Sequence, residues 1–298
     1  MKTEDISIKQ CFVSRWKQNG RLLEIDYSQL EVIGCAIISK DPMMQRDILD
    51  GVDSHSQSAS WLNPEYSYEE ILCKYKANVP MFVRMRKNAK APRFELQYGA
   101  GASSIARNNN ISIEAARGFI DRYYSRYSVL KKFQDDLMQY LKDNIKPSER
   151  RTPNGTPLGV AQWQSPTGRI YSFYEQESPE WASTRTSLSP TQIKNYPIQG
   201  FATGDIVPMM LGVIMRYLLS HTELRDNMLM INTIHDSLLF DINIDVVSYN
   251  HIRDVVKLLE TVPIQLKRYF NFDIDNILPF KVECEIGSNW YDMKPLHL

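Results

Sequence analysis

Hydrophobic and polar positions follow two different periods along this chain, which predicts a fold that mixes strands and helices. A short apolar run at residues 21–25 ends at Asp26 and predicts a core strand. From about 32 to 49 the apolar spacing becomes helical, and Asp41 followed by Pro42 predicts a break inside it. Strand and helix therefore already alternate within the first 50 residues.

Longer helical patterns occur further along the chain. They cover about 80–98, 113–141, 198–219 and 250–270. Ser112 supplies a helix-start signal for the second of them. Between 146 and 191 the chain is rich in Pro, Ser, Thr and Gly, which favours extended segments and loops and leaves the strand content there open.

A predicted hairpin carries a carboxylate at its tip. Two apolar strands, at 228–234 and 238–242, flank the tight link His235-Asp236-Ser237. A last strand is expected at about 280–286. Together these elements predict an α+β fold in which an antiparallel sheet packs with helices.

Composition and charge exclude several classes of protein. The chain has 298 residues, of which 43% are hydrophobic and 23% charged, as in folded globular domains rather than disordered ones. No run of about 20 apolar residues predicts a membrane span, and the first residues lack the apolar run of a signal peptide. We therefore expect a cytoplasmic protein without a membrane partner.

Cysteine usage agrees with that compartment. The four cysteines lie far apart, among apolar neighbours and without the paired spacing of a zinc site. We expect reduced thiols in the core. They are Cys11, Cys35, Cys73 and Cys284.

The charges are balanced overall but unevenly distributed. The chain has 35 Lys and Arg against 35 Asp and Glu, so net charge gives no indication of a nucleic-acid partner. From 84 to 151, however, 15 basic residues stand against 7 acidic ones. Solvated helix faces would explain such a segment if it stood alone.

Two aspartates are placed where strand ends can converge, Asp26 after the first strand and Asp236 at the hairpin tip. Either one alone would be interpreted as a turn or capping residue. Their neighbours change that interpretation. The segment Asp26-Tyr27-Ser28-Gln29-Leu30-Glu31 resembles the first signature of DNA polymerase family A, DYSQxE, and His235-Asp236 resembles the third.

The resemblance implies a two-metal centre. Asp26, Asp236 and the carbonyl of Tyr27 would hold two Mg²⁺ ions, since hard oxygen ligands suit that ion. The ions would activate a primer 3′-hydroxyl and stabilise the departing pyrophosphate. Glu31 would crowd a ribose 2′-hydroxyl and so select deoxynucleotides.

The second signature is the most specific pattern in the sequence. Arg86, Lys90, Phe94 and Tyr98 recur every four residues, followed by Gly99, and four steps of about 100° keep them on one broad helix face. A basic helix face is usually only a solvated one. This pattern resembles the fingers helix of family A, which implies that the cations bind the triphosphate, with Lys90 also catalytic, and that the aromatic rings meet sugar and template base.

Pro92 departs from the family pattern inside this helix. It has no N–H for the carbonyl of Asn88, so we expect a kink.

Weaker matches follow in the family's order. Asp53-Ser54-His55 resembles a D-x-H motif whose histidine contacts phosphate, and Gly168-Arg169 resembles the start of a GRR stretch. Asn195 and Gln199 lie in a segment that resembles N-x-PIQG, with Asp205 beyond it. Each alone could be structural. The resemblance implies DNA contacts for the following residues: Asn195, Gln199, His235, Arg169 and Gly99.

Three more positions complete the comparison. Gly287-Ser288-Asn289-Trp290 resembles a closing G-x-NW motif, in which we expect Trp290 to pack in the core. Ile33 stands where the family has an arginine, and Ser237 where a glutamate usually follows the HD pair. Both metal-binding aspartates of the signatures are nevertheless present.

These features favour a DNA-directed DNA polymerase, a nucleotidyltransferase with a right-hand palm at 1–50 and 192–298 and helical fingers at 51–191, including the motif helix at about 80–99. A single-subunit RNA polymerase and a non-catalytic polymerase-like module are the alternatives. The partners would be primer-template DNA and dNTPs.

The resemblance starts at the palm, without thumb or exonuclease. We therefore expect a second polypeptide that carries the thumb and a proofreading domain, as in a polymerase split between two phage genes. Such a polymerase would act in the host bacterial cytoplasm.

Overall fold

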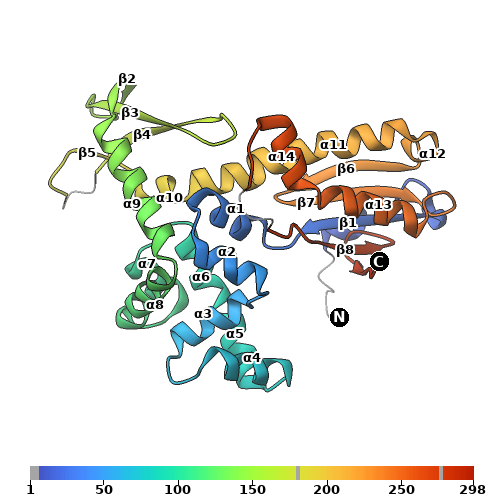
Figure 1. Cartoon of the computed structure of the whole chain (residues 1–298), viewed down its shortest axis with the longest axis horizontal. Helices are drawn as coiled ribbons and strands as arrows, with labels where there is room; N and C mark the ends of the chain where they lie inside the picture. Colours follow the sequence, from blue (N-terminus) through green and yellow to red (C-terminus); the bar gives the residue numbers. More distant parts are fainter. Residues whose placement is uncertain (1–6, 179–181, 275–277) are drawn as a thin grey trace, which may run out of the picture. The chain divides into compact units, whose positions relative to one another are not determined.

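The computed structural model describes residues 7–178, 182–274 and 278–298, and its chain divides into two compact units. Unit 1 comprises Met1–Ile33 and Phe201–Leu298, and unit 2 comprises Gly34–Gly200. Helix α1, Leu30–Ser39, crosses the boundary between them (Figure 1). The division into palm and fingers at 50/51 and 191/192 stays a prediction.

Unit 1 is built on a five-stranded antiparallel sheet in the order β6-β7-β1-β8-β9. Its central strand is β1, which pairs with β7 on one side and β8 on the other. Leu23 and Ile25 of β1 are fully buried, and the alternate positions Glu24 and Asp26 lie on the opposite face. The strands are β1 (Gly20–Tyr27), β6 (Met228–Ile234), β7 (Ser237–Asn243), β8 (Val282–Gly287) and β9 (Lys294–Pro295).

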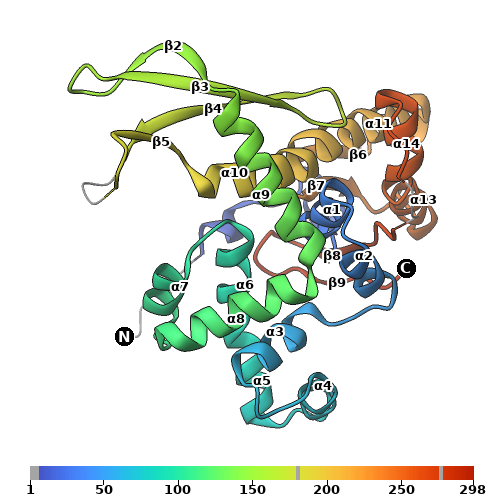
Figure 2. The ribbon, with the colours of Figure 1, turned by 60° about the vertical axis from the view of Figure 1, so that its left-hand side comes forward.

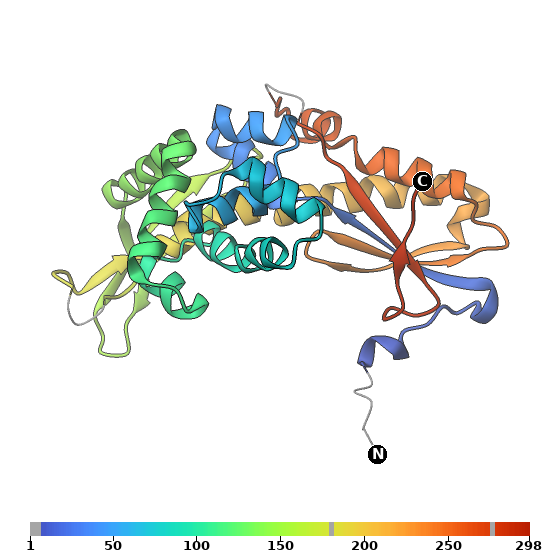
Figure 3. The same ribbon diagram turned by 90° about the horizontal axis from the view of Figure 1, so that it is seen from below.

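Helices of unit 1 pack along this sheet (Figure 3). Ile252, Val255 and Leu259 of α13 are buried at helical spacing, which is the apolar stripe that a covering helix needs. The Tyr27 hydroxyl at the end of β1 donates to the carbonyl of Leu259 at 2.8 Å. The helices are α11 (Val207–Ser220), α12 (Thr222–Arg225), α13 (Tyr249–Leu259) and α14 (Val262–Phe270).

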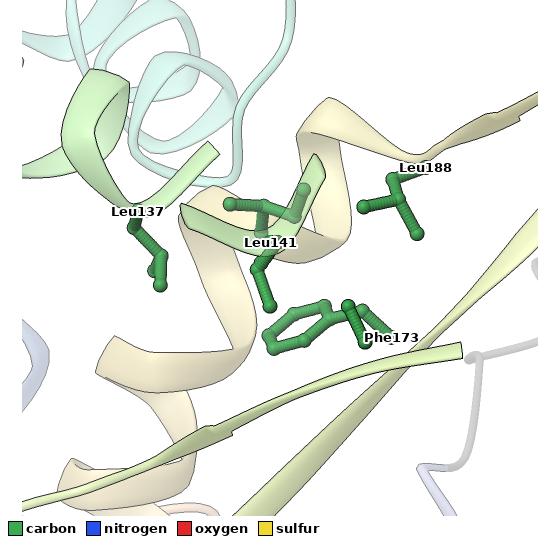
Figure 4. Packing of buried hydrophobic residues seen from close by; sticks show 6 residues of the cluster. Leu137, Leu141, Phe173 and Leu188 are labelled. Atoms are coloured by element: carbon green, nitrogen blue, oxygen red, sulfur yellow. The ribbon is translucent and has the colours of Figure 1, made fainter. Parts of the chain in front are cut away.

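Unit 2 combines a helical part with a four-stranded antiparallel sheet in the order β2-β3-β4-β5. Helices α9 and α10 lie beside this sheet (Figure 2). Leu137 and Leu141 of α9 contact Phe173 and Leu188 of the sheet in a buried cluster (Figure 4). The strands are β2 (Lys146–Arg151), β3 (Pro157–Gln164), β4 (Ile170–Glu177) and β5 (Thr186–Leu188).

Most helices in the helical part of unit 2 have eight to ten residues, and two have 14 and 16 residues. A second cluster of Ala59, Ile71, Phe82 and Ala89 joins α3, α4 and α5. The helices are α2 (Pro42–Leu49), α3 (Ser54–Leu62), α4 (Tyr68–Lys76), α5 (Pro80–Asn88), α6 (Lys90–Gln97), α7 (Ala102–Asn109), α8 (Ile113–Arg126), α9 (Ser128–Asp143) and α10 (Pro190–Gln199).

The α+β class, the first strand and the hairpin are confirmed. Four helix predictions were too long. The pattern at 80–98 ends at Ala89 and restarts there, because Pro92 cannot donate to Asn88. The patterns at 113–141 and 250–270 are also two helices each, and 198–219 is interrupted by a π-helical segment, Gly200–Ile206.

Two cysteine predictions were wrong in part. All four cysteines are free, as expected, but only Cys35 and Cys284 are buried. Cys11 and Cys73 are exposed: Cys11 ends a one-turn helix, Ile8–Cys11, that buries none of its residues, and Ile71 is the residue that α4 buries. Apolar neighbours in the sequence did not indicate which side faces solvent.

One continuous helical stretch, Pro190–Ser220, is long and apolar enough to cross a membrane by length and composition alone. Half of its most apolar window is buried inside the fold, as in a core helix of a soluble protein. This stretch therefore gives weak evidence for a membrane span.

Candidate functional site

Strand pairing brings the two predicted aspartates to the same end of the unit 1 sheet. Asp26 lies opposite Ser237 in the β1–β7 ladder, and Asp236 directly precedes Ser237. The Tyr27 N–H donates to the Asp236 carbonyl at 3.4 Å. The convergence follows from an antiparallel register in which β1 ends where β7 begins.

The turn that presents Asp236 is tight. It has two residues, since Ile234 pairs with Ser237 across it, and His235 adopts a φ of 54°. That left-handed conformation is common for Gly and Asn in two-residue hairpins and unfavourable for a larger side chain. The turn thus accepts local strain to place a carboxylate at its tip.

Negative charge accumulates around Asp26. Its side chain is exposed, yet neighbouring atoms displace part of its hydration, and Asp236, Glu24, Glu283 and Glu285 add repulsion. Partial desolvation first, and these carboxylates second, raise the pKa of Asp26 from 3.8 to about 6.

The Asp236 carboxyl has the same tendency. Partial burial raises its pKa, while its backbone N–H and His235 act in the opposite direction. A bound cation would lower the free-energy cost of ionising both carboxyl groups. Carboxylate oxygens are also ligands that Mg²⁺ prefers. The two aspartates therefore fit a divalent-cation site, although in the described ranges no three His, Cys, Asp or Glu side chains form a metal-holding group.

Glu24 is a residue of this site that the sequence patterns did not single out. Its carboxylate accepts hydrogen bonds from Ser237 Oγ at 2.8 Å and from Trp290 Nε1 at 3.0 Å. The available signal was its place two residues before Asp26, on the same face of the strand.

Trp290 was expected to pack in the core, but it is not among the buried core residues. It is half-buried, meets the Phe12 ring edge-on at 5.5 Å between centroids and lies beneath the Lys9 ammonium at 4.6 Å. Its indole N–H is committed to Glu24. The closing motif thus contacts the sheet face that carries the aspartates.

The residues of the second signature lie in unit 2 on two helices rather than on one continuous face. Arg86 belongs to α5, whereas Lys90 and Phe94 belong to α6 and Tyr98 ends it. Phe94 and Tyr98 are stacked, with ring centroids 6.5 Å apart, and Phe94 is 40% exposed. The single helix is wrong, but the aromatic pair exists.

Arg86 is held by a carboxylate that also caps a helix. Its Nη2 lies 2.7 Å from Asp53 Oδ2 and its Nε 3.1 Å from Oδ1, and the guanidinium packs over the Tyr75 ring. Asp53 also accepts the Ser56 N–H at the start of α3. Partial burial acts to raise the pKa of Asp53, but the hydrogen bonds from Arg86 and Ser56 outweigh it, so the pKa is lowered.

His55 lies next to this group, with its ring centroid 6.0 Å from that of Phe94. Partial burial, followed by the charges of Lys90, Arg86 and Arg93, lowers its pKa from 6.5 to about 4. His55 is therefore neutral at pH 7. Its buried Nδ1 has no hydrogen-bond partner within the described ranges. Since Asp53 caps α3, the alternative of a capping histidine does not apply.

The remaining expected contacts are dispersed over both units. Gly99 has a φ of 87°, and a Cβ there would lie 2.9 Å from the Thr191 backbone, so its role in the fold is itself sufficient to require glycine. Asn195 donates to Gln199 at 3.2 Å within α10. Arg169 follows the β3–β4 turn, and Glu31 lies half-buried in the first turn of α1.

A separate cavity of about 1050 Å³ lies in unit 1, lined by residues that include Arg21, Ile242 and Gly287. Arg21 pairs with Ile242 five positions before Asp26, which is about 16 Å along the strand. This cavity therefore does not contain the carboxylate pair.

Comparison with known proteins identifies the family. The family model described as DNA polymerase family A matches residues 1–292. The DNA polymerase I of Bacillus subtilis is 27% identical over 297 residues, covering 98% of this chain and 28% of the relative. That of Caldicellulosiruptor bescii is 26% identical over 278 residues, covering 92% of this chain and 27% of the relative.

A solved structure shows the same fold. It is described as the POL domain of Pol1 from M. smegmatis in complex with DNA primer-template and dNTP, with a TM-score of 0.65 and 22% identity. The match covers 95% of this chain and 42% of the other. The chain thus spans less than a third of the length of these curated relatives. Because the family model matches nearly the whole sequence, this protein belongs to DNA polymerase family A.

Proposed function

We propose that this protein is a DNA-directed DNA polymerase that adds deoxynucleotides to a primer 3′ end on a template strand. The observation that carries the proposal is the convergence of Asp26 and Asp236 at one sheet end. The raised pKa of Asp26 supports it, since perturbed pKa values cluster at functional sites.

The two aspartates and the Tyr27 carbonyl would hold two Mg²⁺ ions. Such a pair of ions lowers the pKa of an attacking hydroxyl and stabilises charge on the leaving pyrophosphate. The protein's own contribution is placement: β1 and the β6–β7 turn fix both carboxylates before substrate arrives.

Lys90 and Arg86 would bind the triphosphate in different ways. Lys90 is exposed and would provide a mobile positive charge. Arg86 is oriented by Asp53, so it would present a fixed guanidinium edge. His55 is neutral at pH 7 and would act as a hydrogen-bonding group rather than as a cation.

The other assignments follow the family resemblance. Phe94 and Tyr98 would offer stacking surface to sugar and base, and Glu31 would exclude a ribose 2′-hydroxyl. DNA contacts are proposed for the remaining residues: Asn195, Gln199, His235, Arg169 and Gly99.

We further propose a second polypeptide as partner and the cytoplasm as the place of action. The fact that supports a second polypeptide is the net charge of zero, which gives little general attraction for DNA.

One assay separates this function from its alternatives. A labelled primer-template is incubated with the protein, Mg²⁺ and either dNTPs or rNTPs, and the products are separated by length. A DNA polymerase extends with dNTPs and strongly disfavours rNTPs. Equal use of rNTPs would favour an RNA polymerase, and binding without extension under all conditions would favour a non-catalytic module.

A further inference from the structure

Glu24 is fixed more firmly than an ordinary surface carboxylate. It is half-buried on the central strand, and Ser237 and Trp290 each donate to one of its oxygens. Ser237 is only 5% exposed, so its hydroxyl has little access to competing water. Both donors are neutral, and they orient the carboxylate without cancelling its charge.

The partner of Glu24 is the position at which the chain departs from its family. A glutamate usually follows the HD pair, whereas this chain has Ser237. Ser237 lies opposite Asp26 in the ladder, and Glu24 is its diagonal neighbour on β1. A carboxylate is thus absent from the first position of β7 and present on the adjacent strand, where it accepts a hydrogen bond from Ser237.

We propose that Glu24 is a positioning residue for the carboxylate pair and takes over the auxiliary charge that the family usually places after the HD pair. Through Ser237 it ties the start of β7, and with it the turn that carries Asp236, to β1. Its oriented charge increases the attraction of Asp26 and Asp236 for divalent cations. The inference rests on the proposed function.

Trp290 supports the same arrangement from the other side. Its indole N–H holds the second oxygen of Glu24, and the backbone N–H of Trp290 bonds to Phe12 at 3.2 Å. The closing motif of the chain therefore orients the carboxylate from a segment distant in sequence.

The test measures binding of Mn²⁺, as a probe for Mg²⁺, to the DNA-free protein by the electron paramagnetic resonance signal of free Mn²⁺. Glu24→Gln keeps the shape and an acceptor for Ser237 but removes the charge. We expect it to raise the Kd for Mn²⁺ about three- to tenfold, as loss of one nearby charge allows. Glu285→Gln is the matched control, since Glu285 faces the same way opposite Glu24 but is exposed, and should change Kd less than about twofold.

An exchange variant makes the test specific. Glu24→Ser should weaken Mn²⁺ binding, and the added Ser237→Glu should return Kd to within about twofold of the wild type, because the charge moves to the diagonal position. Failure of the exchange to restore binding would overturn the proposal.

The remaining outcomes are also decisive. A Glu24→Gln variant with the same Kd for Mn²⁺ as the wild type would refute a special role for Glu24. An equal increase in Kd in Glu285→Gln would refute it as well. If Glu24→Gln does not fold, Ser237→Ala replaces it, and unchanged Mn²⁺ binding by that variant contradicts the positioning role. Asp26→Asn is measured alongside: if it binds Mn²⁺ normally, the proposed metal site itself fails, independently of Glu24.

Discussion

At the scale of single residues, Asp26 couples stability to pH. Its folded pKa of about 6 lies above the ordinary 3.8, so between these pH values the folded protein binds a proton more readily than the unfolded chain. The metal-free protein should therefore lose stability as pH rises from about 4 to 7. Since the side chain is exposed and screened, we expect a loss of no more than about 1 kcal/mol.

Asp26→Asn should remove this dependence. In EDTA at pH 7.5 the variant should be as stable as the wild type or slightly more stable, and Mg²⁺ should raise the melting temperature of the wild type only. Thermal unfolding at pH 5 and pH 7.5, with and without Mg²⁺, measures both effects. A variant that is destabilised at pH 7.5 would indicate a structural aspartate instead.

Phe94 provides a second prediction at this scale. Its ring is exposed and stacked on Tyr98. The family resemblance implies that a phenylalanine here disfavours nucleotides that lack a 3′-hydroxyl. Phe94→Tyr supplies a hydroxyl in that place, and one added hydrogen bond would increase dideoxynucleotide use by about tenfold. The ratio of dideoxy to deoxy incorporation gives the measurement, with Tyr140→Phe, at an exposed tyrosine on α9, as the control. An unchanged ratio would argue against placing Phe94 at the sugar.

At the scale of elements, one buried carboxylate starts two helices. Asp41 is 1% exposed; its Oδ1 accepts the N–H groups of Met43 and Met44 in α2, and its Oδ2 accepts those of Val129 and Leu130 in α9. Asp41→Ala leaves these donors without a partner, which should cost about 2–4 kcal/mol.

Asp41→Asn is the matched comparison, because its single amide oxygen can cap only one helix. We expect the urea concentration at the midpoint of unfolding to be lower for Asp41→Asn than for the wild type, and lower still for Asp41→Ala. Equal midpoints for all three proteins would show that the double cap contributes nothing.

Some helix ends have a signal in the neighbouring sequence, whereas the start of α9 depends on the distant residue Asp41. The break near Asn88 was indicated by Pro92, and Pro263 stands in the first turn of α14, where the pattern at 250–270 divides. The break at Tyr127 has neither Pro nor Gly beside it, and the start of α9 is capped by a residue 88 positions away. A short stretch of sequence around Tyr127 does not include the capping residue Asp41, so it cannot predict where α9 begins.

The candidate site shows the same division between local and distant information. The convergence of Asp26 and Asp236 was predictable because strand, turn and flanking residues are all contiguous in the sequence. The hydrogen bonds of Glu24 were not, since its partners Ser237 and Trp290 are 213 and 266 positions away. The commitment of Arg86 to Asp53 likewise depends on how α3 and α5 pack.

At the scale of the whole molecule, balanced charge should limit DNA binding. With 35 positive and 35 negative side chains, the protein has little long-range attraction for a phosphate backbone. We expect weak binding of primer-template at physiological salt, a further loss as salt rises, and short products per binding event. Fluorescence anisotropy across a salt series, with a trap-DNA extension assay, measures both. Tight binding and long products from this chain alone would contradict the need for a second polypeptide.

The central claim is that Asp26 and Asp236 form a polymerase centre, and single-nucleotide incorporation by rapid quench is its most direct test. Asp236→Asn should lower the rate constant by at least about a thousandfold at saturating dNTP and Mg²⁺, as loss of a metal-binding charge in a phosphoryl-transfer site would. Asp254→Asn, an exposed carboxylate on α13, is the control and should react like the wild type, with folding checked by circular dichroism. A folded Asp236→Asn protein that incorporates nucleotide within about tenfold of the wild-type rate would contradict the account.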